Sequence, residues 1–431
     1  MALLPNILFG LLLTFGIGFF VRNIQKIRRN IRLGIEVPVA GSSKQRWINM
    51  AKIALGQSKM VRRPLSGFLH LIVYLGFIII NIEVLEIVID GLFGTHRIFA
   101  PIMGPFYGIL IGIFEILALL VFVAVVVFWL RRNVMRLKRF MSSEMKGWPK
   151  QDANLIIYFE MVLMGLFITM NATDVEFQAL SSGNIISGFV SPWFEGLPLH
   201  AIERTAWWLH IAGILIFLNY LYYSKHLHIL LAFPNTYFGS LKPQGQIENL
   251  EAVTKEVKLM MDPDADPYAL SDDTAEVVDK FGASDIFDLN RVQLLNAYTC
   301  TECGRCTSEC PANQTGKKLS PRKIMMDTRD RLEAVGKNID ANNGSFNPDG
   351  KQLLGDYIST EEIWACTSCN ACVETCPVSI NPLSIIMDMR RYLVMEQSSA
   401  PLELNTMMSN IENNGAPWPY NQMDRLNWNN E

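Results

Sequence analysis

Five long apolar stretches constrain this sequence more than any other feature. They cover residues 3–21, 66–90, 100–130, 154–172 and 204–232, and no comparable stretch follows residue 235. Each is close to the roughly 20 residues that an α-helix needs to cross a ~30 Å hydrocarbon core. The first stretch lacks a basic leader and a small-residue cleavage site, so we interpret it as a retained helix. The sequence predicts five membrane spans within residues 1–235.

The distribution of charge predicts how these spans are oriented. Residues 22–63 carry eleven Lys or Arg and one acid, and residues 131–152 carry seven Lys or Arg and two acids. The connection 173–203 has four acids and no base. Because basic loops stay in the cytoplasm, both basic segments are expected there. The N-terminus is then outside, and everything after about residue 235 is cytoplasmic, as in the inner membrane of a bacterium or archaeon.

The remainder of the chain is acidic. Residues 248–288 contain twelve acids and three lysines, which is typical of a solvated linker. We therefore divide the chain into a membrane domain (1–235), a linker (236–290), a cysteine-containing domain (291–395) and a tail (396–431) that would dock a partner subunit. An acidic soluble part argues against nucleic acid as a partner.

All eight cysteines fall in two runs of the same spacing, C-x2-C-x2-C-x3-C-P. This is the spacing of two-cluster ferredoxins, in which three thiolates hold one [4Fe-4S] cluster and the fourth crosses to the other. Disulfides are disfavoured in the cytoplasm, and zinc usually binds pairs of C-x2-C. The expected sets are Cys300, Cys303, Cys306 and Cys376 for one cluster, and Cys366, Cys369, Cys372 and Cys310 for the other.

A helix-like segment follows each cysteine run. These segments are SPRKIMMDTRDRLEAV, where Ser320 and Pro321 mark a start, and PLSIIMDMRRYLVMEQ. We expect an all-α protein, in which a five-helix transmembrane bundle precedes a helical two-cluster ferredoxin domain. Such clusters carry single electrons and transform no substrate by themselves.

Histidines in the apolar stretches suggest a haem. His210 and His228 are 18 residues apart, which places them on one face of a continuous helix, about 27 Å apart. His70 opens the second span at the cytoplasmic side, at the same depth as His228. Two facing imidazoles are the axial ligands of a b-type haem, so we predict that His70 and His228 bind one. His226 points elsewhere and is expected to be an interfacial residue.

The stretches LHIAGILIFLNYLYYSKHLHILLAFPN and SGFLHLIVYLGF resemble two spans of the cytochrome b subunit of respiratory nitrate reductases. That resemblance implies two stacked haems, with His70 and His228 binding the cytoplasmic one. The family's second histidine in the SGFLHLIVYLGF span corresponds to Ile80 here. His210 would then need another partner, His200 or His96, for a second haem, or it would serve a quinone.

The segments AYTCTECGRCTSECPANQTGKKLSPRKI, IWACTSCNACVETCPV and MDMRRYLV resemble iron-sulfur subunits of heterodisulfide reductases and of anaerobic glycerol-3-phosphate dehydrogenase. The tail NIENNGAPWPYNQMDRLNW resembles the segment that leads, in fused members, into a domain with CCG repeats. This sequence holds no CCG, so the resemblance implies a separate CCG-type subunit as the partner, with an electron-transfer flavoprotein as another candidate.

A haem connected to cytoplasmic clusters needs a two-electron carrier in the lipid, and a quinone such as menaquinone fits. Ionisable groups inside spans are candidates for its site. Asn81 lies 11 residues after His70 and is expected to face the bundle interior, as the quinone's hydrogen-bonding partner together with His210. Glu83 is a candidate proton carrier, although Glu83, Glu86 and Asp90 could equally form an outer rim.

These features predict a subunit of a quinone-linked respiratory oxidoreductase that moves electrons between a quinone, haem b and two [4Fe-4S] clusters. The substrate site would be on another subunit. The alternative is a membrane-anchored ferredoxin without haem, which acts as a redox sensor or an anchor.

Overall fold

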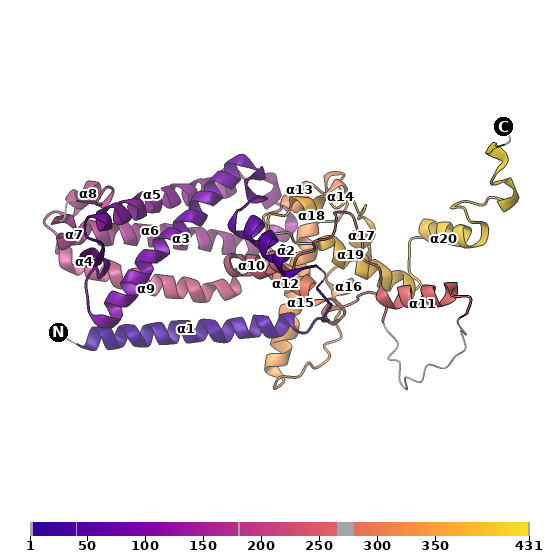
Figure 1. Ribbon diagram of the computed structural model, residues 1–431, viewed down its shortest axis with the longest axis horizontal. Helices are drawn as coiled ribbons and strands as arrows, with labels where there is room; N and C mark the ends of the chain where they lie inside the picture. The colour runs from indigo at the N-terminus through magenta and orange to yellow at the C-terminus, as the bar shows by residue number, and fades with distance from the viewer. Residues whose placement is uncertain (1–2, 40, 180–181, 265–279, 430–431) are drawn as a thin grey trace.

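The protein consists of a long helical bundle with a smaller helical domain packed against one end (Figure 1). The structure is a computed structural model, and it describes residues 3–39, 41–179, 182–264 and 280–429. Within these ranges the chain forms helices, turns and two isolated β-bridges. The all-α prediction is confirmed.

Five helices are long and apolar enough to cross a membrane, as the sequence predicts. They are α1 (Leu3–Ile31), α3 (Pro64–Phe93), α5 (Pro105–Asn133), α6 (Trp148–Thr173) and α9 (Leu199–Tyr220). In α3, α5 and α6 a proline lies in the first turn, where its missing N–H costs no helical hydrogen bond. Large apolar side chains such as Phe15, Phe77 and Ile216 remain exposed on these helices, as expected for surfaces that contact lipid.

The two ends of the bundle differ. At the far end lie the N-terminus and the short helices α4 (Phe99–Met103), α7 (Val175–Ala179) and α8 (Ser187–Val190), as Figure 1 shows. The other end carries α2 (Ser43–Met50) and α10 (His228–Phe238) and contacts the cysteine-containing domain. We call it the docked end.

The last apolar stretch is not one helix, contrary to the prediction for 204–232. Helix α9 ends at Tyr220, Ser224 is extended (φ −112°, ψ 145°), and α10 begins at His228. Tertiary contacts explain the break, because the carboxylate of Asp152 in α6 accepts hydrogen bonds from the Tyr220 hydroxyl (2.6 Å) and the Lys225 amide (3.1 Å). His210 and His228 therefore do not share a helix.

The cysteine-containing domain packs around two helices, α15 (Pro321–Ala341) and α19 (Pro382–Arg391), which lie where the sequence predicts them. Around them are α12 (Arg291–Thr299), α13 (Arg305–Ser308), α14 (Pro311–Gln314), α16 (Leu353–Asp356), α17 (Thr360–Trp364) and α18 (Ala371–Thr375). Helices α11 (Glu251–Met261) and α20 (Leu402–Asn414) lie at the margin farthest from the bundle (Figure 1).

The domain's core begins earlier than residue 291. Ala283, Ile286 and Leu289, which fall in the predicted linker, are fully buried in it. The same apolar cluster also includes Ile27 of α1 and Leu221 and Leu227 from the α9–α10 break. Bundle and domain therefore share a continuous core, and burial of this apolar area stabilises their relative position.

Candidate redox centres

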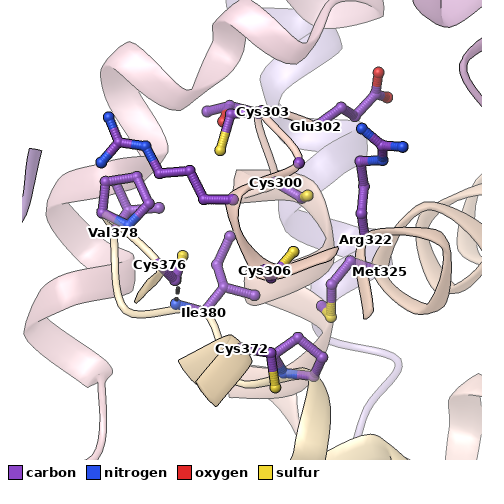
Figure 2. A pocket seen from close by; sticks show the side chains of 15 residues that line it. Cys300, Glu302, Cys303, Cys306, Arg322, Met325, Cys372, Cys376, Val378 and Ile380 are labelled. Atoms are coloured by element: carbon purple, nitrogen blue, oxygen red, sulfur yellow. Dashed lines mark hydrogen bonds between the residues drawn. The ribbon is translucent and has the colours of Figure 1, made fainter. Parts of the chain in front are cut away.

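The first three cysteines of the first run line one cavity together with cysteines of the second run. Cys300 caps α12, Cys303 and Cys306 flank the start of α13, and Cys376 follows α18. Figure 2 shows these four thiols and Cys372 lining the cavity, together with Arg322, Met325 and Ile380. The Ile380 amide donates to the Cys376 sulfur at 3.3 Å. Among the described residues, no three His, Cys, Asp or Glu side chains form a site for a single metal ion.

The two cysteine loops have the same backbone form. Glu302 (φ +54°) and Gly304 (φ +71°) in the first loop are matched by Ser368 (φ +55°) and Asn370 (φ +60°) in the second. These are the third and fifth positions of each C-x2-C-x2-C stretch. Positive φ turns the chain sharply, and Gly and Asn tolerate it best. The repeated spacing in the sequence therefore corresponds to a repeated three-dimensional loop.

The fourth cysteine of each run lies near the other run. Burial, and after it the proximity of Cys303, raises the pKa of the Cys376 thiol to about 11. Burial also raises the pKa of Cys372 to about 12, with contributions from Cys366, Cys310 and Cys369. Buried thiols of this kind need a strongly positive group to ionise them, and an iron-sulfur cluster provides one.

His70 and His228 meet at the docked end, as predicted. Their ring centres are 6.4 Å apart and their planes are inclined by 41°. Nδ1 of His228 lies 3.2 Å from the backbone oxygen of Lys225, whereas Nδ1 of His70 is buried and has no partner among the described residues. The hydrogen bond leaves Nε2 of His228 free to bind a metal.

His226 is not the interfacial residue that the sequence predicts. Its side chain is 15% exposed, and its ring centre lies 5.3 Å from that of His228 and 5.4 Å from that of Phe217. Its Nε2 is 3.6 Å from a carboxylate oxygen of Glu160 in α6. After α9 ends, residues 225–227 form a 3₁₀ turn. This turn, and not a continuous helix, directs the His226 side chain into the bundle.

The predicted face of α3 is wrong for Asn81. Asn81 is exposed, and its amide donates to the Phe77 backbone oxygen one turn earlier in the same helix. Glu83, Glu86 and Asp90, for which an outer rim was the alternative, are all buried. The physical reason is that an amide can satisfy a donor within its own helix, whereas the carboxylates of Glu86 and Asp90 find their donors outside α3.

A buried polar cluster occupies the far end. Arg97 donates to Asp174 (2.8 Å), Asn171 (2.9 Å) and Tyr107 (3.2 Å), and the Tyr107 hydroxyl donates to Glu86 (2.9 Å). Glu115 joins it through Asn171 and through the backbone amides of residues 186 and 187. Glu83 lies beside this cluster, but its Oε2 is buried and has no partner among the described residues. The sequence analysis missed Arg97, although its position in a short connection between two apolar spans was a usable signal.

His210 is 2% exposed, lies 6.2 Å from the Phe167 ring and hydrogen bonds to the backbone of Leu163. The structure does not bring His200 or His96 to it. His200 is exposed ten residues earlier in the same helix, about 15 Å along its axis. His96 is held by Asp174, with Nε2 3.3 Å from a carboxylate oxygen. The Nδ1 of His210 has no partner among the described residues.

The docked end contains charged contacts that sequence analysis also missed. Glu302 and Arg305, both inside the first cysteine run, are buried. Glu302 pairs with Lys225, and Arg305 donates to the Met60 backbone oxygen at 3.3 Å. Two charged residues between closely spaced cysteines were a signal of this role.

Comparison with known proteins agrees with this arrangement. A family model described as a 4Fe-4S dicluster domain matches residues 299–380. Over its whole length the chain is 29% identical to a probable iron-sulfur-binding oxidoreductase, FadF, of Bacillus subtilis, and it spans 61% of that relative. Over 87% of its length it is 26% identical to an EtfAB:quinone oxidoreductase of Syntrophomonas wolfei, and it spans 52% of that relative.

A shorter match is to one of the subunits of a ferredoxin/F420H2-dependent CoB-CoM heterodisulfide reductase of Methanosarcina acetivorans. The two are 30% identical over 28% of this chain and 60% of that relative. No solved structure matches the chain. The predicted dicluster domain and the similarity to heterodisulfide reductases are confirmed. The chain is similar to iron-sulfur oxidoreductases, contains a match to a 4Fe-4S dicluster domain and has five candidate membrane spans.

Proposed function

We propose that the chain carries electrons between a quinone in the membrane and a soluble partner, through haem b and two [4Fe-4S] clusters. The observation that carries this proposal is the His70–His228 pair, because it lies at the end of the bundle against which the first cysteine loop packs. A lipid-phase carrier and a soluble domain need such a relay between them.

The two clusters are assigned to the cysteine sets expected from the sequence. Cys300, Cys303 and Cys306 line one cavity with Cys376, which supports the first set. The electrostatic contact of Cys372 with Cys310, Cys366 and Cys369 supports the second. Each set combines a three-cysteine loop with the last cysteine of the other run, as in two-cluster ferredoxins.

Haem b is assigned to His70 and His228. Imidazole nitrogens bind metals at about 2.0 Å, so two imidazoles that bind one iron from opposite sides have ring centres about 6 Å apart. The observed 6.4 Å fits this value. Both histidines present a ring nitrogen that is free for iron, and Lys225 fixes the tautomer of His228 through its backbone oxygen.

The quinone site is assigned to the far half of the bundle, with Glu83 and His210 as its candidate residues. Each has a buried polar atom with no partner among the described residues. Quinol oxidation releases two electrons and two protons, and quinone reduction takes up the same number. Glu83 is placed to exchange a proton, and His210 to hydrogen bond a quinone oxygen. Asn81 is excluded from the candidate quinone site because it is exposed.

This assignment uses one haem. Neither His200 nor His96 lies near His210, so we propose that His210 serves the quinone and does not bind a haem. The soluble partner is a separate CCG-type subunit or an electron-transfer flavoprotein; the second is supported by the name of the Syntrophomonas wolfei relative. The basic segments 22–63 and 131–152 support a cytoplasmic location for the cysteine-containing domain.

The test is a pyridine haemochrome assay on the full chain purified in detergent. We expect one haem b per chain, which His70→Ala and His228→Ala abolish and His226→Ala retains. Loss of haem in the His226 variant alone would contradict the ligand assignment. Iron and acid-labile sulfide contents for two clusters, but no haem in the unaltered chain, would support the membrane-anchored ferredoxin instead.

A quinol-dependent reduction of the clusters, followed by stopped-flow absorbance, tests the electron path. We expect reduction at catalytic rates in the unaltered chain and a marked slowing in Glu83→Gln with full haem and iron contents. Haem-loaded protein whose clusters are not reduced by any quinol, and whose reduced clusters do not reduce a quinone, would overturn the proposal.

A further inference from the structure

The two cysteine loops share a backbone form but differ in their charges. In the first loop the third and sixth positions are Glu302 and Arg305, and in the second they are Ser368 and Ala371. Glu302 is 2% exposed and Arg305 is 3% exposed. Burying two charges costs free energy unless each is paired, so their partners indicate what the loop is built to contact.

Glu302 reaches the segment that carries His228. Its carboxylate pairs with the Lys225 ammonium on one side and with Arg329 of α15 at 2.9 Å on the other. The backbone oxygen of Lys225 is the atom that lies 3.2 Å from Nδ1 of His228. Glu302 is therefore connected to His228 through a single residue.

Arg305 reaches the turn that precedes the helix carrying His70. Its guanidinium donates to the Met60 oxygen at 3.3 Å and contacts the Met60 sulfur at 3.0 Å. The Met60 oxygen packs against Gly67 of α3, since a Cβ there would lie 3.0 Å from it. Gly67 is one turn before His70. The first cysteine loop thus contacts the segments next to both His70 and His228.

The second loop differs at the same two positions. Ser368 and Ala371 bring no charge to the bundle, and Cys369 is exposed. Glu374, which follows the third cysteine of the second loop, forms an ion pair with Arg62 of the bundle. The side chains of Glu374 and Arg62 are 43% and 56% exposed. Exposed pairs of this kind contribute little to stability. The second loop is therefore the one left accessible to another molecule.

We propose that Glu302 and Arg305 are positioning residues that dock the first loop on the histidine pair, so that its cluster alone exchanges electrons with the haem. The second cluster then passes electrons to or from the soluble partner at Cys369. This order rests on the proposed function. A haem held by His70 and His228 and a cluster held by the first loop would exchange one electron at a time, one group being oxidised as the other is reduced, with no bond broken and no proton required.

The order is tested with cluster-specific variants of the haem-loaded full chain. Cys369→Ala should lose the second cluster, leave haem-to-cluster transfer at the rate of the unaltered chain in stopped-flow absorbance, and abolish transfer to a soluble acceptor. Cys303→Ala should lose the first cluster and slow haem-to-cluster transfer by about tenfold or more. The reverse pattern, or equal slowing in both, would overturn the proposed order.

The positioning role has its own readout. Arg305→Gln and Glu302→Gln should increase hydrogen exchange of residues 59–62 and 225–228, and slow haem-to-cluster transfer, with haem and iron contents unchanged. Arg62→Gln, which breaks the exposed pair next to the second loop, is the matched control and should change neither. If hydrogen exchange and haem-to-cluster electron transfer stay unchanged in both variants, Glu302 and Arg305 do not position the loop.

Failure of the proposed function and failure of the proposed docking of the first loop are distinguishable. A chain without haem b contradicts the proposed function in the pyridine haemochrome assay. Hydrogen exchange still reports whether Glu302 and Arg305 fix the loop against residues 59–62 and 225–228. Magnetic coupling in the electron paramagnetic resonance spectrum then identifies which cluster is near the ferric haem.

Discussion

His70 and His228 face each other across the docked end of the bundle, with 6.4 Å between their ring centres. The chain reaches His228 through the break that follows Tyr220, the last residue of α9. Asp152 holds this break through Tyr220 and Lys225. A carboxylate in another helix therefore helps to fix the segment that leads to His228.

The first prediction concerns this carboxylate. Asp152→Ala removes a buried acceptor of two hydrogen bonds, and we expect a loss of about 1–3 kcal/mol in the free energy of unfolding. If His70 and His228 hold a haem, we also expect weaker binding of it, since the backbone amide of Lys225 would lose its acceptor. Thermal unfolding and haem absorbance in detergent measure the two effects. Asp330→Ala, which changes an exposed carboxylate, is the control; a haem spectrum that stays unchanged in Asp152→Ala would contradict the role of the break.

The second prediction concerns the turns of the cysteine loops. Gly304 has φ +71°, and a Cβ there would lie 2.6 Å from a guanidinium nitrogen of Arg322. Gly304→Ala should therefore cost about 1–2 kcal/mol in backbone strain alone and reduce cluster content. Asn370→Gly, at the equivalent position of the second loop, should retain both clusters because glycine adopts its φ of +60° freely. Iron content and circular dichroism compare the two; equal cluster loss would argue against this explanation.

A third prediction concerns pH. The hydrogen bond to Asp174 raises the pKa of His96 above its ordinary value. A raised histidine pKa contributes stability that is fully present below the unfolded pKa, about 6.5, and is lost as pH rises through the folded pKa. The Tm should therefore decline slightly as the pH rises above about 6.5.

The His96→Gln variant should weaken this decline. Because the His96 side chain is 40% exposed, solvent screens the effect, and the decline is expected to be small. His200→Gln changes another histidine of the far end, one that is exposed, and should leave the decline intact. A steeper decline in His96→Gln than in the unaltered chain would refute the assignment.

The fourth prediction concerns loss of the clusters to oxidants. Cys369 is exposed, whereas Cys300 and Cys376 are buried. Oxidants attack accessible sulfur first, so the second cluster should be lost before the first during titration with ferricyanide. Electron paramagnetic resonance of samples re-reduced at each step follows the two signals. Cys369→Ala identifies the second cluster's signal, and earlier loss of the first cluster would contradict the exposure argument.

Much of this architecture could be predicted because the signals are local. Apolar stretches define the five spans, and Ser320 and Pro321 mark the start of α15 without reference to distant residues. The spacing of the cysteines predicts both loops. The sequence also places His70 and His228 at the same depth in the membrane, and this was sufficient to pair them.

The wrong predictions have different physical causes. The break at Ser224 depends on Asp152, which lies in another helix. The faces of α3 were misassigned because Asn81 finds an acceptor in its own helix, while Glu86 finds donors at Phe99 and Tyr107. The early start of the domain core, at Ala283, was concealed by an acidic composition that is otherwise typical of a linker.

The helix that follows the break has a mechanical consequence. α10 begins at His228 and packs against α12, whose C-terminal cap is Cys300. The two helices are in direct contact, so a tilt of the cysteine-containing domain would pull on His228. Force applied to the domain by a docking partner would therefore reach His228 inside the bundle, and binding at the domain would shift the position of this histidine.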